Sequence, residues 1–203
     1  SLDERRGSGV ASHSLLYIPD GEALKRFSFG YDQLIADYIW IRLIQVFGNR
    51  VVEDVEYDWI FHALDTVTTL DPQFVEAYEA GGLMLTVMVD HVGQSNLILE
   101  KGISADLGEW KIPFLLGFNY FNFLRDYQKA ALYLELATEH PGHPKWLPLL
   151  VAKLHVQDHS PDIALEFLVR VYENTHDIYL RKQLEILMKE VLVERDLILL
   201  EQA

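Results

Sequence analysis

The chain has 203 residues, of which 50% are hydrophobic, and it has no cysteine and a formal net charge of −14 at pH 7. This length allows one domain or two with a sizeable core, and the lack of cysteine excludes disulfides and thiolate metal sites. The negative charge argues against nucleic acid as a partner, because it repels phosphate backbones.

The N-terminal part of the sequence predicts a lead-in followed by two helices. Residues 1–13, which include GSG, are expected to form a flexible segment. A turn at 19–22 (PDGE) precedes a short helix near 21–28. A longer helix near 32–47 ends at the Gly48-Asn49 pair. Its apolar band consists of Leu34, Ile35, Tyr38, Ile41, Ile44 and Phe47.

Apolar residues keep helical spacing along the rest of the chain, and strand-like alternation is scarce. Further helices are predicted near 55–70, 73–89, 93–104, 110–124, 127–139, 144–156, 161–173 and 177–201. The apolar runs at 80–89 and 112–124 are too short to cross a bilayer as helices. Helices of this length joined by short loops predict an all-α protein of stacked helical hairpins.

Charge is concentrated between residues 53 and 109. This segment has twelve Asp or Glu residues and one basic residue, Lys101, which gives a local charge of −11. Two interpretations stay open: a solvated face that keeps the protein soluble, and a docking surface for a basic partner.

Small residues occur at regular places among bulky ones in residues 116–142. Gly117 is followed by Tyr120, and Ala130 by Ala137 and a Pro-Gly turn. This pattern resembles the tetratricopeptide repeat (TPR), a helix-turn-helix unit of about 34 residues. The resemblance implies that Gly117 and Ala130 are the points where the two helices of a hairpin approach closely.

Degenerate copies of the pattern lie on both sides, so that the resemblance covers about residues 37–175. Their matching residues are Trp40, Leu43, Ile44 and Phe47; Tyr78, Gly81, Gly82, Leu85 and Gly102; and Trp146, Leu149, Leu150, Ala164 and Phe167. The resemblance implies a right-handed superhelix of about four TPR-like hairpins (37–175). Before it we expect a flexible lead-in (1–18) and an N-terminal helical extension (19–36), and after it a C-terminal capping helix (176–203). An irregular helical bundle is the alternative.

Residues 15–48 and 111–142 also resemble segments of bacterial TPR proteins that have an N-terminal membrane anchor and mostly unassigned functions. This resemblance implies an anchor or signal upstream of Ser1, with the repeats on the periplasmic side of a membrane. A cytoplasmic location is the alternative.

The residues that could catalyse a reaction or bind a metal do not form a recognisable site in the sequence. Four histidines could in principle hold zinc: His140, His143, His155 and His159. However, the segment around His159 is predicted to be a loop, so the four-residue spacing of His155 and His159 does not place them on one helix face. No phosphate-binding loop or nucleophile motif is present, and no carboxylate pair is singled out by an apolar setting. We therefore predict no enzyme activity, no metal and no cofactor.

A binding groove is the remaining candidate site. In TPR proteins the first helix of each hairpin lines a concave surface, and the resemblance implies which positions do so here. The candidate residues are Glu76, Glu79, Leu83, Phe114, Phe118, Phe121, Asn122, Leu147 and Val151. Such a groove would suit an amphipathic or basic segment of a protein partner. The alternative is that the phenylalanines are core residues.

The sequence therefore predicts a non-catalytic scaffold or adaptor, a subunit or assembly factor of a bacterial membrane-associated complex. The alternative is a structural subunit whose aromatic surfaces are permanently buried by its neighbours. No small-molecule substrate is predicted, and membrane contact is expected only through the upstream anchor.

Overall fold

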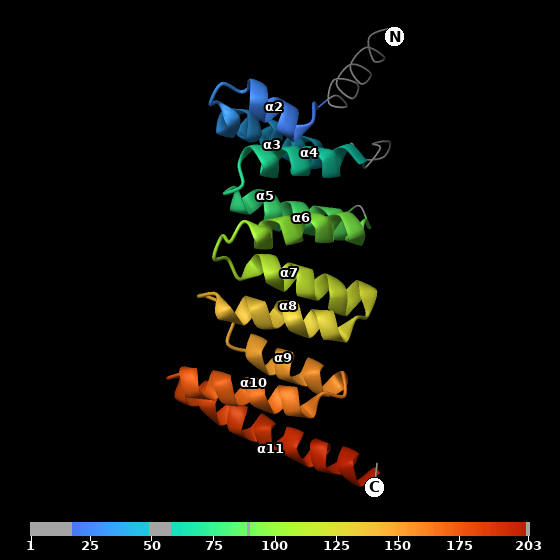
Figure 1. Cartoon of the computed structure of the whole chain (residues 1–203), viewed down its shortest axis with the longest axis vertical. Helices are drawn as coiled ribbons and strands as arrows, with labels where there is room; N and C mark the ends of the chain where they lie inside the picture. The colour runs from blue at the N-terminus through green and yellow to red at the C-terminus, as the bar shows by residue number, and fades with distance from the viewer. Residues whose placement is uncertain (1–17, 49–57, 89, 202–203) are drawn as a thin grey trace, which may run out of the picture. The chain divides into compact units, whose positions relative to one another are not determined.

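The computed structural model describes residues 18–48, 58–88 and 90–201, and within these residues it contains helices and no strand (Figure 1). The all-α prediction is confirmed for this part of the chain. The chain divides into two compact units, Ser1–Leu107 and Gly108–Ala203. The predicted lead-in over residues 1–13 lies outside the described residues.

The first unit is built from consecutive helices that pack on one another. They are α2 (Gly21–Phe27), α3 (Asp32–Gly48), α4 (Asp58–Leu70), α5 (Val75–Leu83) with its π-helical continuation η2 (Met84–Met88), and α6 (Val92–Ser104). The Asp20 side chain caps α2 by accepting hydrogen bonds from the backbone N–H groups of Glu22 and Ala23. Helix α2 lies close to α4, because a Cβ on Gly21 would be 3.0 Å from Thr69 Cβ.

Within the second unit, too, helices that are consecutive in the chain pack on one another (Figure 1). Its elements are α7 (Lys111–Asn119) with the π-helical continuation η3 (Tyr120–Leu124), α8 (Tyr127–Glu139), α9 (Leu147–Gln157), α10 (Pro161–Asn174) and α11 (Ile178–Glu201). Its buried core includes Ala130, Leu134, Val151, Leu168 and Leu184, which come from α8 to α11.

Three of the hairpin turns have the same construction. Asp90, Arg125 and His159 each adopt a left-handed conformation, with φ of 56°, 56° and 54°. In each case the next residue is the N-cap of the following helix, so the N-caps His91, Asp126 and Ser160 are spaced by 35 and 34 residues. The structure thus contains an internal repeat of the turn, although none of the left-handed positions is a glycine.

The first helix of two hairpins ends in a π-helical turn, which the sequence pattern did not predict. The backbone N–H of His91 donates to Leu85 O, and that of Asp126 donates to Tyr120 O, at 2.9 and 3.0 Å. These seven-residue turns satisfy carbonyl groups at the helix end that would otherwise lack a partner. The predicted helices near 73–89 and 110–124 are therefore present, but their last turns are wider than an α-helix.

The predicted role of the small residues is confirmed at Gly117. A Cβ placed there would lie 2.7 Å from Leu134 Cγ and 3.1 Å from Ala130 O. Gly82 has the same relation to α6, because a Cβ on it would lie 2.7 Å from Leu99 Cδ2. Gly82 and Gly117 are 35 residues apart, as are Leu99 and Leu134, so the two hairpins repeat the same close contact.

The apolar band of α3 lies on the opposite side from its buried face. Leu34, Tyr38 and Ile41 are exposed, whereas Ala36 and Leu43 are fully buried. The periodicity predicted the helix, but packing against α4 buried its other side, so Leu34, Tyr38 and Ile41 of the predicted band did not become core. The side chain of Phe47, the last member of the predicted band, lies outside the described residues.

Candidate functional site

An aromatic surface runs along the beginning of the second unit. It consists of Trp110, Phe114, Phe118, Phe123 and Trp146, and we refer to these five residues as the aromatic surface. Phe118 and Phe123 are each 39% exposed and Trp146 is 51% exposed, while Trp110 and Phe114 are half-buried. The surface therefore offers open aromatic side chains that rest on partly buried ones.

The rings of the aromatic surface contact one another in series. Centroid distances are 5.6 Å for Trp110–Phe114, 6.4 Å for Phe114–Phe118 and 6.3 Å for Phe118–Phe123. The ring of Trp146, at the start of α9, lies 6.0 Å from that of Phe114 in an edge-on geometry. Such pairs stabilise each other beyond their buried area and hold the surface in one arrangement.

The helix geometry explains how these residues come together. Trp110, Phe114 and Phe118 are spaced by four residues, which places them on one side of α7. Phe123 follows Phe118 by five residues. Because the π-helical η3 has more residues per turn than an α-helix, this spacing places Phe123 on the same side as Phe118. Phe123 could not be predicted from α-helical spacing, because the π-helical turn changes its side. Trp110 was not among the predicted residues, although its four-residue spacing to Phe114 is a signal present in the sequence.

The other predicted residues of the second unit have different positions. Phe121 is half-buried and packs on Tyr127 of α8, with 5.9 Å between ring centroids. Asn122 is exposed on η3. Leu147 and Val151 are fully buried in the core of this unit, so neither side chain is open to a partner. The aromatic surface therefore retains Phe114 and Phe118 from the predicted set.

The predicted acidic residues lie on α5 of the first unit. Glu76 and Leu83 are exposed, whereas Glu79 is half-buried and its Oε1 atom has no exposed surface. These residues recur at intervals of three and four, so they share one side of the helix. Glu76 is the carboxylate of this set that is open to solvent.

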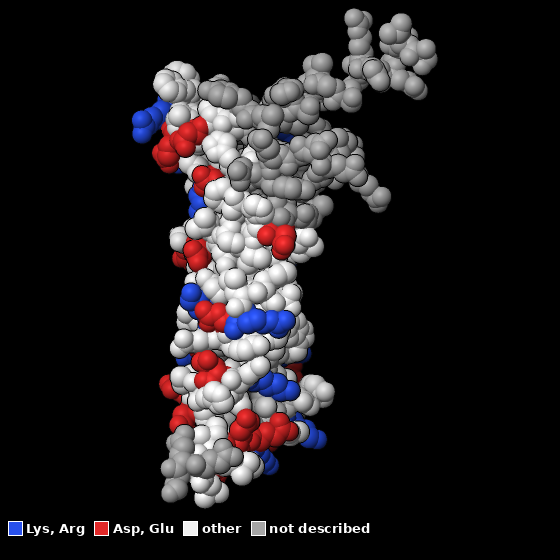
Figure 2. Space-filling model, turned by 90° about the vertical axis from the view of Figure 1, so that its right-hand side faces the viewer, with Lys and Arg blue, Asp and Glu red and all other residues white. Residues whose placement is uncertain are grey.

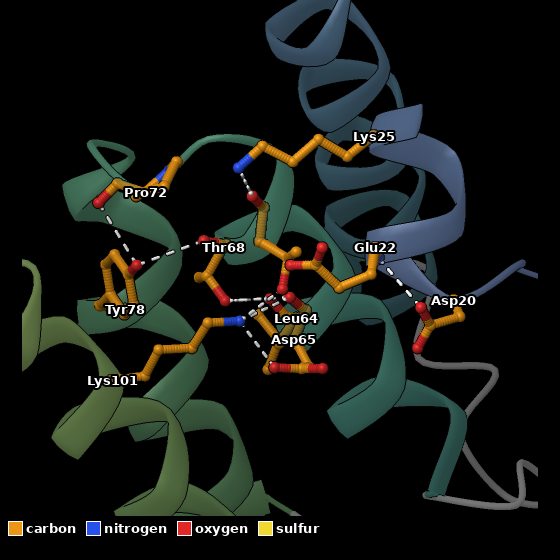
Figure 3. Close-up of polar contacts among 10 residues, drawn as sticks. Asp20, Glu22, Lys25, Leu64, Asp65, Thr68, Pro72, Tyr78 and Lys101 are labelled. Carbon is orange, nitrogen blue, oxygen red and sulfur yellow. Dashed lines mark hydrogen bonds and ion pairs between the residues drawn. The ribbon is translucent and has the colours of Figure 1, made fainter. Parts of the chain in front are cut away.

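Lys101, the single basic residue between residues 53 and 109, serves as a tie between two helices (Figure 3). Its Nζ atom donates to Asp65 O, Asp65 Oδ1 and Thr69 Oγ1 at 2.9, 2.7 and 2.7 Å. The ammonium group therefore joins α6 to α4 and balances the negative charge of Asp65. The net charge of residues 53–109 then comes from their other carboxylates.

Tyr78 of α5 adds a second buried polar contact to the first unit (Figure 3). Its hydroxyl donates to the carbonyl oxygens of Thr68 and Pro72 at 3.4 and 3.3 Å. Burial raises the pKa of the Tyr78 hydroxyl to about 12, and the charge of Asp71 acts in the same direction. The hydroxyl is thus a neutral donor that holds α5 against the end of α4.

A cleft of about 470 Å³ lies among α8, α9, α10 and α11. Glu135 and Arg170, which line the cleft, form an ion pair, and Glu135 also contacts His155 Nε2 at 3.2 Å. The hydrogen bond from His155, together with the charge of Arg170, lowers the pKa of the Glu135 carboxyl. At the rim Lys145 pairs with Asp177, and their hydrogen bond lowers the pKa of that carboxyl.

The chemistry of this cleft is that of compensated ion pairs. Glu135 is held ionised and accepts hydrogen bonds, which makes it a poor proton donor at neutral pH. Among the described residues no group of three or more His, Cys, Asp or Glu side chains is arranged to hold a metal ion. His155 faces Glu135, whereas His159 occupies the left-handed position of the turn before α10.

Charged side chains are scattered over the face of the molecule shown in Figure 2. Lysine and arginine alternate there with aspartate and glutamate among many uncharged residues. In the described part of the chain, no helix is both long enough and apolar enough to span a membrane.

A comparison with known protein families finds no family model that matches this chain. A comparison with curated proteins likewise finds no match.

Proposed function

We propose that the chain is a non-catalytic scaffold or adaptor, and that its aromatic surface binds a hydrophobic segment of a partner protein. The observation that carries this proposal is the connected series of rings from Trp110 to Phe123, in which Phe118 is open to solvent. The exposed Trp146 joins this series through its contact with Phe114. Aromatic anchors dominate the affinity of many protein interfaces, and rings already fixed by their neighbours lose little entropy on binding.

The architecture that we propose is a right-handed superhelix of about four TPR-like hairpins, with an N-terminal extension and a C-terminal capping helix. The turns spaced by 35 and 34 residues support it, because the TPR unit is about 34 residues long. The close contacts of Gly82 with Leu99 and of Gly117 with Leu134 support it further. Repeat proteins of this kind offer extended surfaces to other proteins.

The partner segment that we propose is amphipathic with a basic flank. Glu76 is exposed on α5, and the local charge of residues 53–109 is −11 while Lys101 is engaged with Asp65. Such a field speeds the approach of a basic segment, whereas aromatic burial slows its release. A bacterial membrane-associated complex on the periplasmic side, or alternatively in the cytoplasm, is the setting proposed from the sequence resemblance alone.

A second candidate function is a structural subunit that is permanently buried in a larger assembly. The exposed apolar side chains of Leu34, Tyr38 and Ile41 on α3 favour it, because obligate interfaces are more apolar than transient ones. The two functions differ in kinetics: an adaptor releases its partner reversibly, and a permanent subunit does not.

The test is selection of binders from a phage-displayed library of random peptides, about 16 residues long, on the purified chain; a segment of this length forms roughly four helical turns. We expect enriched peptides to combine apolar residues with a basic flank. Phe118→Ala should weaken their binding by about 2 kcal/mol, mainly through faster dissociation. Glu76→Lys should instead slow association and flatten its dependence on salt.

The control is Leu132→Ala, which removes an exposed apolar side chain from α8 outside the aromatic surface. Its binding kinetics should match those of the wild type. Peptides that bind the Phe118→Ala and wild-type chains equally well, with both chains folded, would place the binding surface elsewhere. Enrichment of acidic peptides would contradict the proposed chemistry of the partner.

A further inference from the structure

The last helix, α11, has a second apolar side besides the one that it buries. Leu180, Leu184 and Val191 pack in the core of the second unit. A separate set lies in solvent: Tyr179, Ile186, Val193 and Leu200, which are 72%, 46%, 60% and 74% exposed. We refer to these four residues as the outer stripe. A helix that only closed a stack would be expected to have a polar outer side.

The outer stripe has a regular period. Its members are spaced by seven residues, and seven residues of α-helix fall about 20° short of two full turns. The stripe therefore runs nearly straight along one side of the helix for about 30 Å. Leu197, four residues after Val193, is also exposed and widens the stripe near its end. The outer stripe thus has the seven-residue period of a heptad, at one of the two positions that form the seam of a helix pair.

The charges beside the outer stripe are divided between the two halves of α11. Residues 178–189 contain three basic residues and one acidic residue, and residues 190–200 contain three acidic residues and one basic residue. Lys182 and Lys189 are exposed in the first half, and Glu190 and Asp196 are exposed in the second. The helix is thus basic at its beginning and acidic at its end.

This arrangement is complementary to itself when the helix is reversed. About the midpoint between Lys189 and Glu190, Tyr179 corresponds to Leu200 and Ile186 corresponds to Val193. The basic half corresponds to the acidic half, and Lys182 comes opposite the region of Asp196. A two-fold interface requires this property, because the same surface must fit itself.

We propose that two copies of this chain pair through α11 in antiparallel orientation. Ile186 packs against Val193 of the second copy, and Tyr179 packs against Leu200 of the second copy. Lys182 of each copy lies near Asp196 of the other, at the edge of the apolar contact. This pairing uses a different surface from the proposed partner site, so its test does not depend on that site.

The first test measures the mass of the full chain in solution over a range of concentrations by analytical ultracentrifugation. We expect a dimer whose dissociation constant rises at least about tenfold in the Ile186→Glu, Val193→Glu double variant, because two charges would enter an apolar contact. Both side chains are exposed in the single chain, so the variant should keep its helical signal. Leu132→Glu, on the exposed side of α8, is the matched control and should leave the dimer unchanged.

If the chain stays monomeric at every concentration, the proposal is overturned, and the outer stripe would then have to contact a different protein. A dimer that persists unchanged in the double variant overturns it as well, because the contact would then lie outside α11.

The second test reads the orientation by disulfide formation, which is simple because the chain has no cysteine. Chains with Lys182→Cys and chains with Asp196→Cys are oxidised separately and as an equimolar mixture. An antiparallel pair gives a cross-linked dimer of the two different chains in the mixture and little cross-linking in either sample alone. Efficient cross-linking of the Lys182→Cys chain with itself would indicate a parallel pair and overturn the proposed arrangement.

Discussion

Gly117 of α7 and Leu134 of α8 are in such close contact that a Cβ on the glycine would lie 2.7 Å from Leu134 Cγ. Real Cβ atoms essentially never come this close, and Ala130 O lies 3.1 Å from the same position. The backbone of α7 can therefore approach α8 only because residue 117 has no side chain. The distance between the two helices is set by this pair.

A single methyl group at Gly117 should consequently loosen the hairpin. We expect Gly117→Ala to lower the free energy of unfolding by about 1–3 kcal/mol through overpacking. Gly93→Ala is the matched control, because a Cβ there meets nothing within 4 Å. It should leave stability unchanged or raise it by about 0.4–1 kcal/mol. Urea denaturation of both variants gives the comparison, and equal stabilities would show that α7 and α8 are not in tight contact.

The Lys101 tie predicts a local loss of stability in the first unit. Lys101→Met keeps the length of the side chain but removes the donors to Asp65 and Thr69. We expect a loss of about 1–2 kcal/mol, since the bonds are charge-assisted but partly exposed. Hydrogen exchange should speed up in α4 and α6. Lys153→Met, an exposed change on α9, should leave both helices as protected as in the wild type.

The Glu135 carboxyl predicts a dependence of stability on pH. Its pKa is lowered from 4.5 in the folded chain by His155 and Arg170. The ionised group therefore stabilises the fold above about pH 4.5, and this contribution is lost as pH falls through the lowered pKa. Glu135→Gln should be less stable than the wild type by about 1–2 kcal/mol at pH 7.

The difference between the wild type and Glu135→Gln should shrink as the pH falls below 4.5, and denaturation at pH 7 and at several acidic pH values measures it. Glu139→Gln, an exposed change on the same helix, serves as the control and should follow the wild type at every pH. A difference that stays constant down to the acidic end would contradict the assigned ion pair.

The left-handed conformation of Arg125 predicts which substitutions at this turn lower the stability of the chain and which do not. A non-glycine residue at φ of 56° is strained by contact of its Cβ with the backbone, and a β-branched residue is strained more. We expect Arg125→Val to lose about 1–2 kcal/mol and Arg125→Gly to lose nothing. Thermal denaturation of both variants checks this order, and a valine variant as stable as the glycine variant would show that the turn has another conformation.

The local structure could be predicted from the sequence because its causes are local. Asp126 caps α8 by accepting a hydrogen bond from the backbone N–H of Lys129, and the Pro-Gly pair after residue 140 prevents continuation of the helix. The helix predicted over 127–139 accordingly has the same limits as α8. The π-helical turns at η2 and η3 could not be predicted, since no residue type marks them and Arg125 adopts a left-handed conformation without being glycine.

The tertiary structure decided which apolar side chains became core and which became surface. The resemblance to TPR proteins made Leu147 and Val151 candidates for the groove, yet they are buried, while Phe118 and Trp146 remain open. On α11 the sequence determined the helix, but only packing in the second unit selected Leu184 for the core and left Ile186 in solvent. Helix formation depends on neighbours within one or two turns, whereas burial depends on helices far away in the chain. The periodic pattern of one helix does not specify which other helix packs against it.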